Sequence, residues 1–155
     1  MRNIWIVVAD AGRALILSKR EGIAQLKIVG QIENPLGRAH NVDLVSDQPG
    51  RLSKHRSGVK SAMAAPTEPH EHQLKEFSHQ VNHFLDEAAC RGDFDLLVLV
   101  APSHFLGLLR LSMRPAPRGR LIHRLANDFT RLTVEELQLR LAPMLECAFA
   151  EAGSI

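Results

Sequence analysis

With 155 residues, the chain is long enough for one domain around a single hydrophobic core, and its 45% hydrophobic and 23% charged residues are ordinary for a globular protein. Its only cysteines, Cys90 and Cys147, exclude a disulfide framework and a cysteine-based zinc site. The formal net charge is only +2, and the first apolar stretch, residues 4–9, is too short for a signal-peptide core or a membrane span. We therefore expect a single cytoplasmic domain over residues 1–155 with no membrane association.

The first segment of the chain predicts three strands joined by tight turns. Residues 3–9 form a run rich in β-branched side chains, which indicates a buried strand. Asp10 begins a turn and is expected to cap it, because an Asp side chain bonds nearby backbone amides. A second strand is predicted over residues 13–18. A half-exposed third strand follows, in which apolar residues alternate with polar ones: Leu26, Ile28 and Ile32.

A long loop is predicted over residues 34–69, because this segment has no sustained hydrophobic period and is rich in proline and glycine. A connection of this length inside a compact domain is usually functional or disordered. Basic side chains are interspersed with its glycines: Arg38, Arg51, Lys54, Arg56 and Lys60. Mobile cationic segments of this kind can become ordered on RNA.

The second half of the chain alternates helices with strands. Apolar residues at helical spacing predict a helix over residues 71–90 that ends at Gly92. The unbroken apolar run Leu96–Ala101 indicates a central strand covered on both faces. A helix over residues 102–112, a strand over residues 121–125 and a last helix complete the chain. Its final helix begins with a capping box made by Thr133 and Glu136.

The element order is therefore βββ-α-β-α-β-α. Three antiparallel strands followed by two right-handed crossovers give the order of the RNase H-like fold. We predict an α/β domain of this type, in which helices flank a mixed five-stranded sheet.

Positive charge is concentrated in one segment. Residues 96–127 contain no acidic residue but five arginines, which create a local field that attracts phosphate. We take Arg114, Arg118 and Arg120 as a secondary RNA-binding patch. The alternative is that these arginines pair with carboxylates elsewhere in the fold. The segment also contains Arg110 and Arg124.

Two groups of residues have the side chains that a metal site requires. His72, Glu76, His79 and His83 are spaced by four, three and four residues, a pattern that can hold Zn²⁺. This stripe lies opposite the apolar face of its helix, so a solvated polar face is the favoured interpretation. A two-metal nuclease could use Asp10 and Glu76, but the fourth strand ends without a carboxylate. We therefore predict neither a metal nor another cofactor.

Five segments in order resemble a bacterial family, the proteins required for attachment to host cells. They span residues 5–137 and read WIVVADAGRALIL, LVSDQPGR, PHEHQLKEFSHQ, LVLVAPSHFLGLLR and NDFTRLTVEEL. The family name describes a phenotype and implies no particular chemistry.

A more distant resemblance is to the middle domain of the eukaryotic and archaeal class 1 release factors, which has an RNase H-like topology. Its long loop carries a Gly-Gly-Gln motif that promotes hydrolysis of peptidyl-tRNA on the ribosome. Residues 54–63 read KHRSGVKSAM and resemble the release-factor stretch KHGRGGQSAL. Gly58 corresponds to the first glycine of the motif, Val59 to the second and Lys60 to the glutamine. Val59 adopts the backbone angles of glycine only at high cost, and Lys60 lacks the amide, so we expect no efficient hydrolysis.

The leading hypothesis is a non-catalytic or weakly catalytic RNA-binding module that acts on ribosomes or tRNA. Its expected contacts lie in the long loop: Arg51, Lys54, Arg56, Gly58 and Lys60. The alternative is a protein-interaction or regulatory protein that influences attachment to host cells. A third hypothesis is an RNase H-like or other hydrolase.

Overall fold

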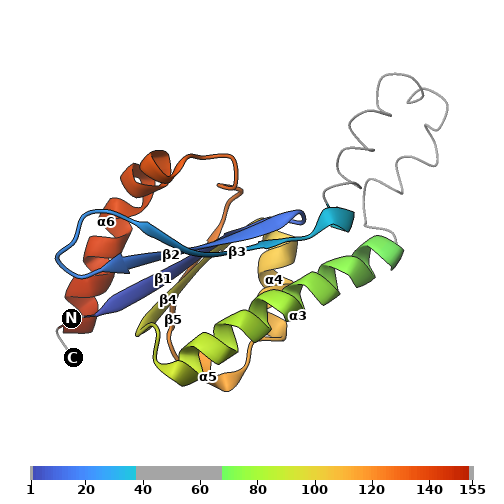
Figure 1. Cartoon of the computed structure of the whole chain (residues 1–155), viewed down its shortest axis with the longest axis horizontal. Coiled ribbons are helices and arrows are strands. Elements are labelled where there is room, and N and C mark those ends of the chain that lie inside the picture. The colour runs from blue at the N-terminus through green and yellow to red at the C-terminus, as the bar shows by residue number, and fades with distance from the viewer. Residues whose placement is uncertain (1, 38–67, 154–155) are drawn as a thin grey trace.

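The computed structural model describes residues 2–37 and 68–153, which form an α/β fold with a five-stranded sheet (Figure 1). The strands are β1 (Asn3–Ala9), β2 (Arg13–Arg20), β3 (Lys27–Glu33), β4 (Leu96–Ala101) and β5 (Leu121–Ala126). The helices are α3 (Glu68–Arg91), α4 (Ser103–Leu111), α5 (Pro115–Arg118) and α6 (Val134–Gly153). The predicted RNase H-like order is confirmed, and the short α5 is an element that the hydrophobic pattern did not predict.

The strand order in the sheet is β3-β2-β1-β4-β5. β2 is antiparallel to both β1 and β3, whereas β4 is parallel to both β1 and β5. The predicted mixed sheet is therefore confirmed. β4 lies inside the sheet as expected, although β1 occupies the middle position.

Helices cover both faces of the sheet, with α3 and α4 on one side and α6 on the other (Figure 1). Alternate residues of β1 enter the two cores. Trp5 and Val7 pack on the α3 side, where the Trp5 ring stacks on Phe94 with centroids 4.9 Å apart. Ile4 and Ile6 pack on the α6 side. This burial on both faces explains why the strand is continuously apolar. Among the described helices, none is both long and apolar enough to cross a bilayer.

The predicted helix boundaries rest on local chemistry that the structure confirms. Gly92 has φ +79° directly after α3, a conformation that glycine adopts without a steric penalty. Thr133 and Glu136 form the capping box of α6. The Thr133 Oγ1 atom accepts a hydrogen bond from the Glu136 amide at 3.1 Å, and Glu136 Oε1 accepts one from the Thr133 amide at 2.9 Å.

The regular alternation predicted for the third strand is wrong, because the pairing of β2 with β3 shifts register between Ile16 and Leu17. The shift leaves Val29 without a partner on β2. Leu26, which precedes the strand, packs in the α6-side core, whereas Ile32 packs in the α3-side core. One additional residue in a strand moves every side chain that follows it to the opposite face of the sheet.

Candidate functional site

Three arginines surround one cleft beside the edge strand β5, at the end of α4. The cleft has a volume of about 670 Å³, and we call it the arginine cleft. Its lining comes from α4, the turn after it, α5 and β5: Gly107, Arg110, Leu111, Met113, Arg118, Leu121, Ile122 and Arg124. Apolar side chains and guanidinium groups therefore share the same depression.

A shift in strand pairing brings Arg124 to this cleft. Leu121 lies opposite Leu97 on β4, but His123 lies opposite the next residue, Val98, so Ile122 has no partner. After the shift Arg124 lies opposite Leu99. Leu97 and Leu99 both belong to the core on the α4 side, so Leu121 and Arg124 share that face. Strict alternation would have placed them on opposite faces, and irregularities of this kind commonly re-aim a side chain.

The arginines of the cleft carry charge that no carboxylate of the described residues neutralises. Arg110, Arg118 and Arg124 are exposed, and within the described residues none of them forms an ion pair with Asp or Glu. This arrangement argues against the alternative in which the arginines of residues 96–127 pair with acidic groups elsewhere. A cluster of uncompensated guanidinium groups attracts anions, above all those with oxygens that match the guanidinium fork.

The predicted secondary patch is distributed over three different environments. Arg118 lines the arginine cleft, where its Nη2 atom donates a 2.8 Å hydrogen bond to the Arg110 carbonyl oxygen. Arg114 is exposed and lines a separate polar groove between α3 and the end of α4. The other residues of this groove are His79, Asn82, His83, Asp86 and Ser112.

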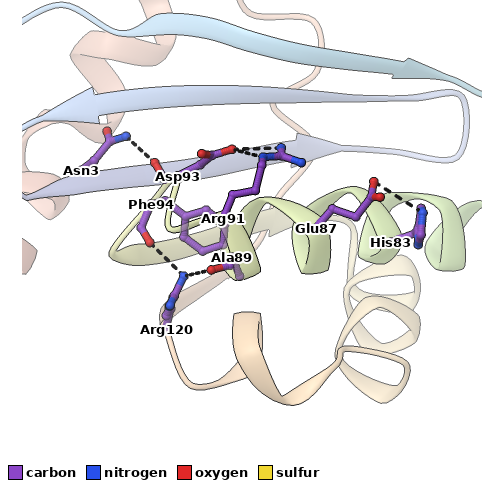
Figure 2. A network of polar contacts seen from close by, with 8 residues as sticks. All are labelled: Asn3, His83, Glu87, Ala89, Arg91, Asp93, Phe94 and Arg120. Carbon is purple, nitrogen blue, oxygen red and sulfur yellow. Dashed lines mark hydrogen bonds and ion pairs between the residues drawn. The ribbon is translucent and has the colours of Figure 1, made fainter.

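Arg120, the third member of the predicted patch, is directed into the protein (Figure 2). Its Nη1 atom donates to the carbonyl oxygen of Ala89 at 2.8 Å and to that of Phe94 at 3.1 Å. The guanidinium carbon also lies 5.6 Å from the centroid of the Phe94 ring. Arg120 thus ties the end of α3 to the segment leading into β4. Charge alone grouped it with Arg118, and no local sequence signal separates the two.

The histidine stripe is spread along the exposed side of α3. His72 Nε2 lies 3.1 Å from Glu76 Oε1, while His83 Nε2 lies 3.5 Å from Glu87 Oε1 (Figure 2 shows the second pair). His79 is exposed and lines the polar groove. Across the residues that the structure describes, no three His, Cys, Asp or Glu side chains gather closely enough to hold a metal ion.

Asn82 is a polar residue in the core that sequence analysis did not identify. It is 3% exposed, and its Nδ2 atom donates to the Leu109 carbonyl at 2.9 Å and to Ser112 Oγ at 2.7 Å. Its Oδ1 atom is buried and has no hydrogen-bond partner in the part of the chain that the structure describes. The sequence signal that could have identified Asn82 is its position one helical turn after Ser78, within the apolar face of α3.

Asp10 caps the first hairpin, as predicted. Its Oδ1 atom accepts hydrogen bonds from the backbone amides of Gly12 at 2.7 Å and Arg13 at 2.9 Å. Its Oδ2 atom lies 2.9 Å from the hydroxyl oxygen of Thr130, which is buried. Glu76, its hypothetical metal-binding partner in a nuclease, instead contacts His72 on the exposed side of α3. The geometry therefore gives no support to two-metal catalysis.

The basic residues of the long loop, together with the predicted RNA contact Gly58, lie outside the described residues: Arg38, Arg51, Lys54, Arg56 and Lys60. The described residues that flank this segment contact the chain just after the carboxyl ends of β1 and β4. The Asn34 side chain donates to the Ala11 carbonyl at 2.8 Å, and a Cβ atom on Gly37 would clash with the same oxygen. On the other side, Glu71 Oε1 lies 2.6 Å from His104 Nε2 in the first turn of α4. Arg118 lies near the opposite end of the sheet from these contacts. It precedes β5, and β5 runs in the same direction as β4 and β1.

A family model described as "Protein required for attachment to host cells" matches residues 5–141. The chain belongs to this family. No curated protein matches the sequence. Solved structures that are similar to this chain include an archaeal translation termination factor, with 13% identity and a TM-score of 0.42 over 98% of this chain. Another is described as an archaeal protein, with 11% identity and a TM-score of 0.45 over the same share. This host-attachment family member spans 41% of the length of each.

Proposed function

We propose that this member of the host-attachment family is a non-catalytic RNA-binding module that contacts the phosphate backbone through the arginine cleft. The observation that carries the proposal is the convergence of Arg110, Arg118 and Arg124 on one cleft with no carboxylate paired to them among the described residues. Their charge comes from a segment, residues 96–127, that lacks any acidic residue. Positive charge of this kind supplies most of the affinity of proteins for polyanions.

Guanidinium groups suit phosphate better than ammonium groups do, because their planar fork donates two parallel hydrogen bonds. Arg118 is already oriented by its bond to the Arg110 carbonyl, so less side-chain freedom is lost when a ligand binds. The α4 helix also ends here, and Arg118 supplies a donor and a positive charge to its terminal carbonyl groups. The cleft is therefore partly preorganised before RNA arrives.

The long loop supplies the second part of the proposed interface, through Arg51, Lys54, Arg56, Gly58 and Lys60. The similarity of residues 54–63 to the release-factor loop supports ribosomes or tRNA as the partner, and hence a cytoplasmic location. Val59 and Lys60 take the places of the second glycine and the glutamine, which supports binding without hydrolysis of peptidyl-tRNA. The cleft and the loop would contact different parts of an extended RNA.

The test is the salt dependence of RNA binding by the full chain, measured by fluorescence anisotropy with a labelled tRNA. A linear fall of log affinity with log salt concentration is expected, because each neutralised phosphate releases counterions. Replacing Arg110 and Arg124 together with Ala should weaken binding by about tenfold or more and reduce the slope by about one unit per lost contact. The matched control replaces two exposed arginines outside the cleft, Arg20 and Arg131. Equal losses in both variants, or no binding at low salt, would refute the proposal.

A second candidate is a protein-interaction role in attachment to host cells, which the description of the family favours. Such a partner would bind with a weaker salt dependence than RNA does, because its contacts would release few condensed counterions. Absence of RNA binding, together with a specific protein partner whose affinity survives loss of Arg110 and Arg124, would favour this role over the first.

A further inference from the structure

The arginine cleft contains an apolar floor that a phosphate-binding surface does not require. Leu121 and Ile122 are partly buried there, and Met113, which lines the same cleft, is buried. Leu111, in the last turn of α4, lines the same cleft with 80% of its surface exposed. Isolated exposed leucines are common on protein surfaces. Leu111 differs because it immediately follows Arg110 in the sequence and both side chains line one cleft.

The floor is held in a defined position by backbone hydrogen bonds. The Arg110 carbonyl accepts from the Met113 amide at 3.4 Å as well as from Arg118 Nη2 at 2.8 Å. The Leu108 carbonyl accepts from the Ser112 amide at 3.3 Å and from Ser112 Oγ at 3.1 Å. The turn that carries Leu111 and Met113 is therefore hydrogen-bonded from both sides.

We infer that the arginine cleft binds a single-stranded polynucleotide, with an unpaired base against the apolar floor and the flanking phosphates on the arginines. This inference rests on the proposed function and specifies the class of ligand. A double helix keeps its bases paired and stacked, so it would present charged phosphates and sugars to Leu111. A single strand offers the apolar face of a base together with a phosphate on either side, which matches a cleft of both characters.

The size of the cleft agrees with this assignment. A volume of about 670 Å³ lies within the range of roughly 300–1,000 Å³ that is usual for sites that enclose small organic groups. Such a space admits a nucleoside unit but cannot enclose a double helix. Burial of Leu111 by a base would also remove apolar surface from water, which favours binding. Base and phosphate contacts together account for all the kinds of side chain that line the cleft.

The experiment compares labelled strands of about 12 nucleotides, a length in the usual range of single-strand sites. Its arms are single-stranded RNA, single-stranded DNA, duplex RNA, and a DNA strand in which the bases are replaced by abasic units. We expect the single strands to bind about tenfold more tightly than both the duplex and the abasic strand, because only they can place a base on the floor. Equal affinity for RNA and DNA supports recognition of base and phosphate alone, whereas tighter binding of RNA adds recognition of the ribose hydroxyl.

Two leucine variants test the floor itself. Leu111→Ala should weaken single-strand binding by about threefold to tenfold, since it removes much of one apolar contact. The same variant should leave the affinity for the abasic strand unchanged. Leu139→Ala is the matched control, because Leu139 is 79% exposed but lies on α6, away from the cleft. Affinity for the duplex or abasic strand equal to that for the single strands would overturn the inference while leaving the proposed function intact. Failure of every strand to bind would overturn both.

Discussion

Arg118 donates a hydrogen bond from its Nη2 atom to the carbonyl oxygen of Arg110, at a distance of 2.8 Å. The bond joins the short helix α5 to the last turn of α4, so the positions of the two side chains at the cleft depend on each other. This relationship gives Arg118 two roles, one in charge and one in orientation, and suitable substitutions separate them.

Arg118→Lys keeps the positive charge but loses the planar fork. We expect this variant to bind RNA about threefold more weakly with an unchanged salt slope, whereas Arg118→Ala should also lower the slope by about one unit. Anisotropy titrations at several salt concentrations provide both quantities. If the lysine variant loses as much slope as the alanine variant, the two roles are not separable in this way.

Substitution of Arg120 should lower the stability of the fold and should not weaken RNA binding. Its guanidinium group bonds the carbonyl oxygens of Ala89 and Phe94, and removing it leaves both without this donor. Arg120→Ala should lower the free energy of unfolding in urea by about 1–3 kcal/mol. Arg114→Ala is the control at an exposed position and should change it by less than about 0.5 kcal/mol. Similar stabilities of the two variants would contradict the structural role of Arg120.

The basic loop can be compared directly with the cleft. Replacing Lys54, Arg56 and Lys60 together with Ala should weaken tRNA binding and flatten its salt slope by about one unit per lost phosphate contact. The fold should survive, as circular dichroism and thermal unfolding can verify. Should this triple variant bind like the parent while the Arg110 and Arg124 variant does not, the cleft alone is the RNA site.

Peptide release provides a functional check on residues 59 and 60. Purified protein added to ribosomes that carry a peptidyl-tRNA model substrate should release no peptide above background, because Val59 and Lys60 replace the second glycine and the glutamine of the release-factor motif. Co-sedimentation with ribosomes in the same samples should still occur. Release at the level of a release-factor control would show that hydrolysis does not require that motif here.

Substitution of Asp10 tests whether its carboxylate stabilises the fold or binds a metal ion. Asp10→Ala removes the acceptor of the Gly12 and Arg13 amides and the contact with Thr130. We expect the free energy of unfolding to fall by about 2 kcal/mol, and by the same amount in Mg²⁺ as in EDTA. Stabilisation of the parent, but not of the variant, by Mg²⁺ would instead identify Asp10 as a ligand and revive the nuclease hypothesis.

Local and periodic signals were sufficient to predict most of the fold. The Asp10 turn, Gly92 after α3 and the Thr133–Glu136 capping box each depend on residues close together in the sequence. Continuous burial of β1 and β4 follows from helices on both faces of the sheet. The short helix α5 was missed because residues 115–118 are too few to show a helical period.

The candidate site was less predictable, since its geometry depends on strand pairing. The acid-free segment indicated a basic surface, but Arg124 reaches the cleft only because the pairing of β5 with β4 shifts by one residue. Arg120 and Arg118 are two residues apart and have the same charge, yet one bonds the end of α3 and the other the end of α4. Such a difference depends on the packing of distant elements, which composition does not encode.

The anchors at Gly37 and Glu71 have a consequence for how this chain can evolve. The close approach of Gly37 to the Ala11 carbonyl and the contact of Glu71 with His104 fix the two boundaries independently of the sequence between them. Both contacts are made by residues that flank the intervening sequence, so exchange, lengthening or shortening of that sequence leaves the contacting residues unchanged. The same scaffold can in this way acquire new partners through insertion and deletion, while the side chains that pack against β1 remain under a separate constraint.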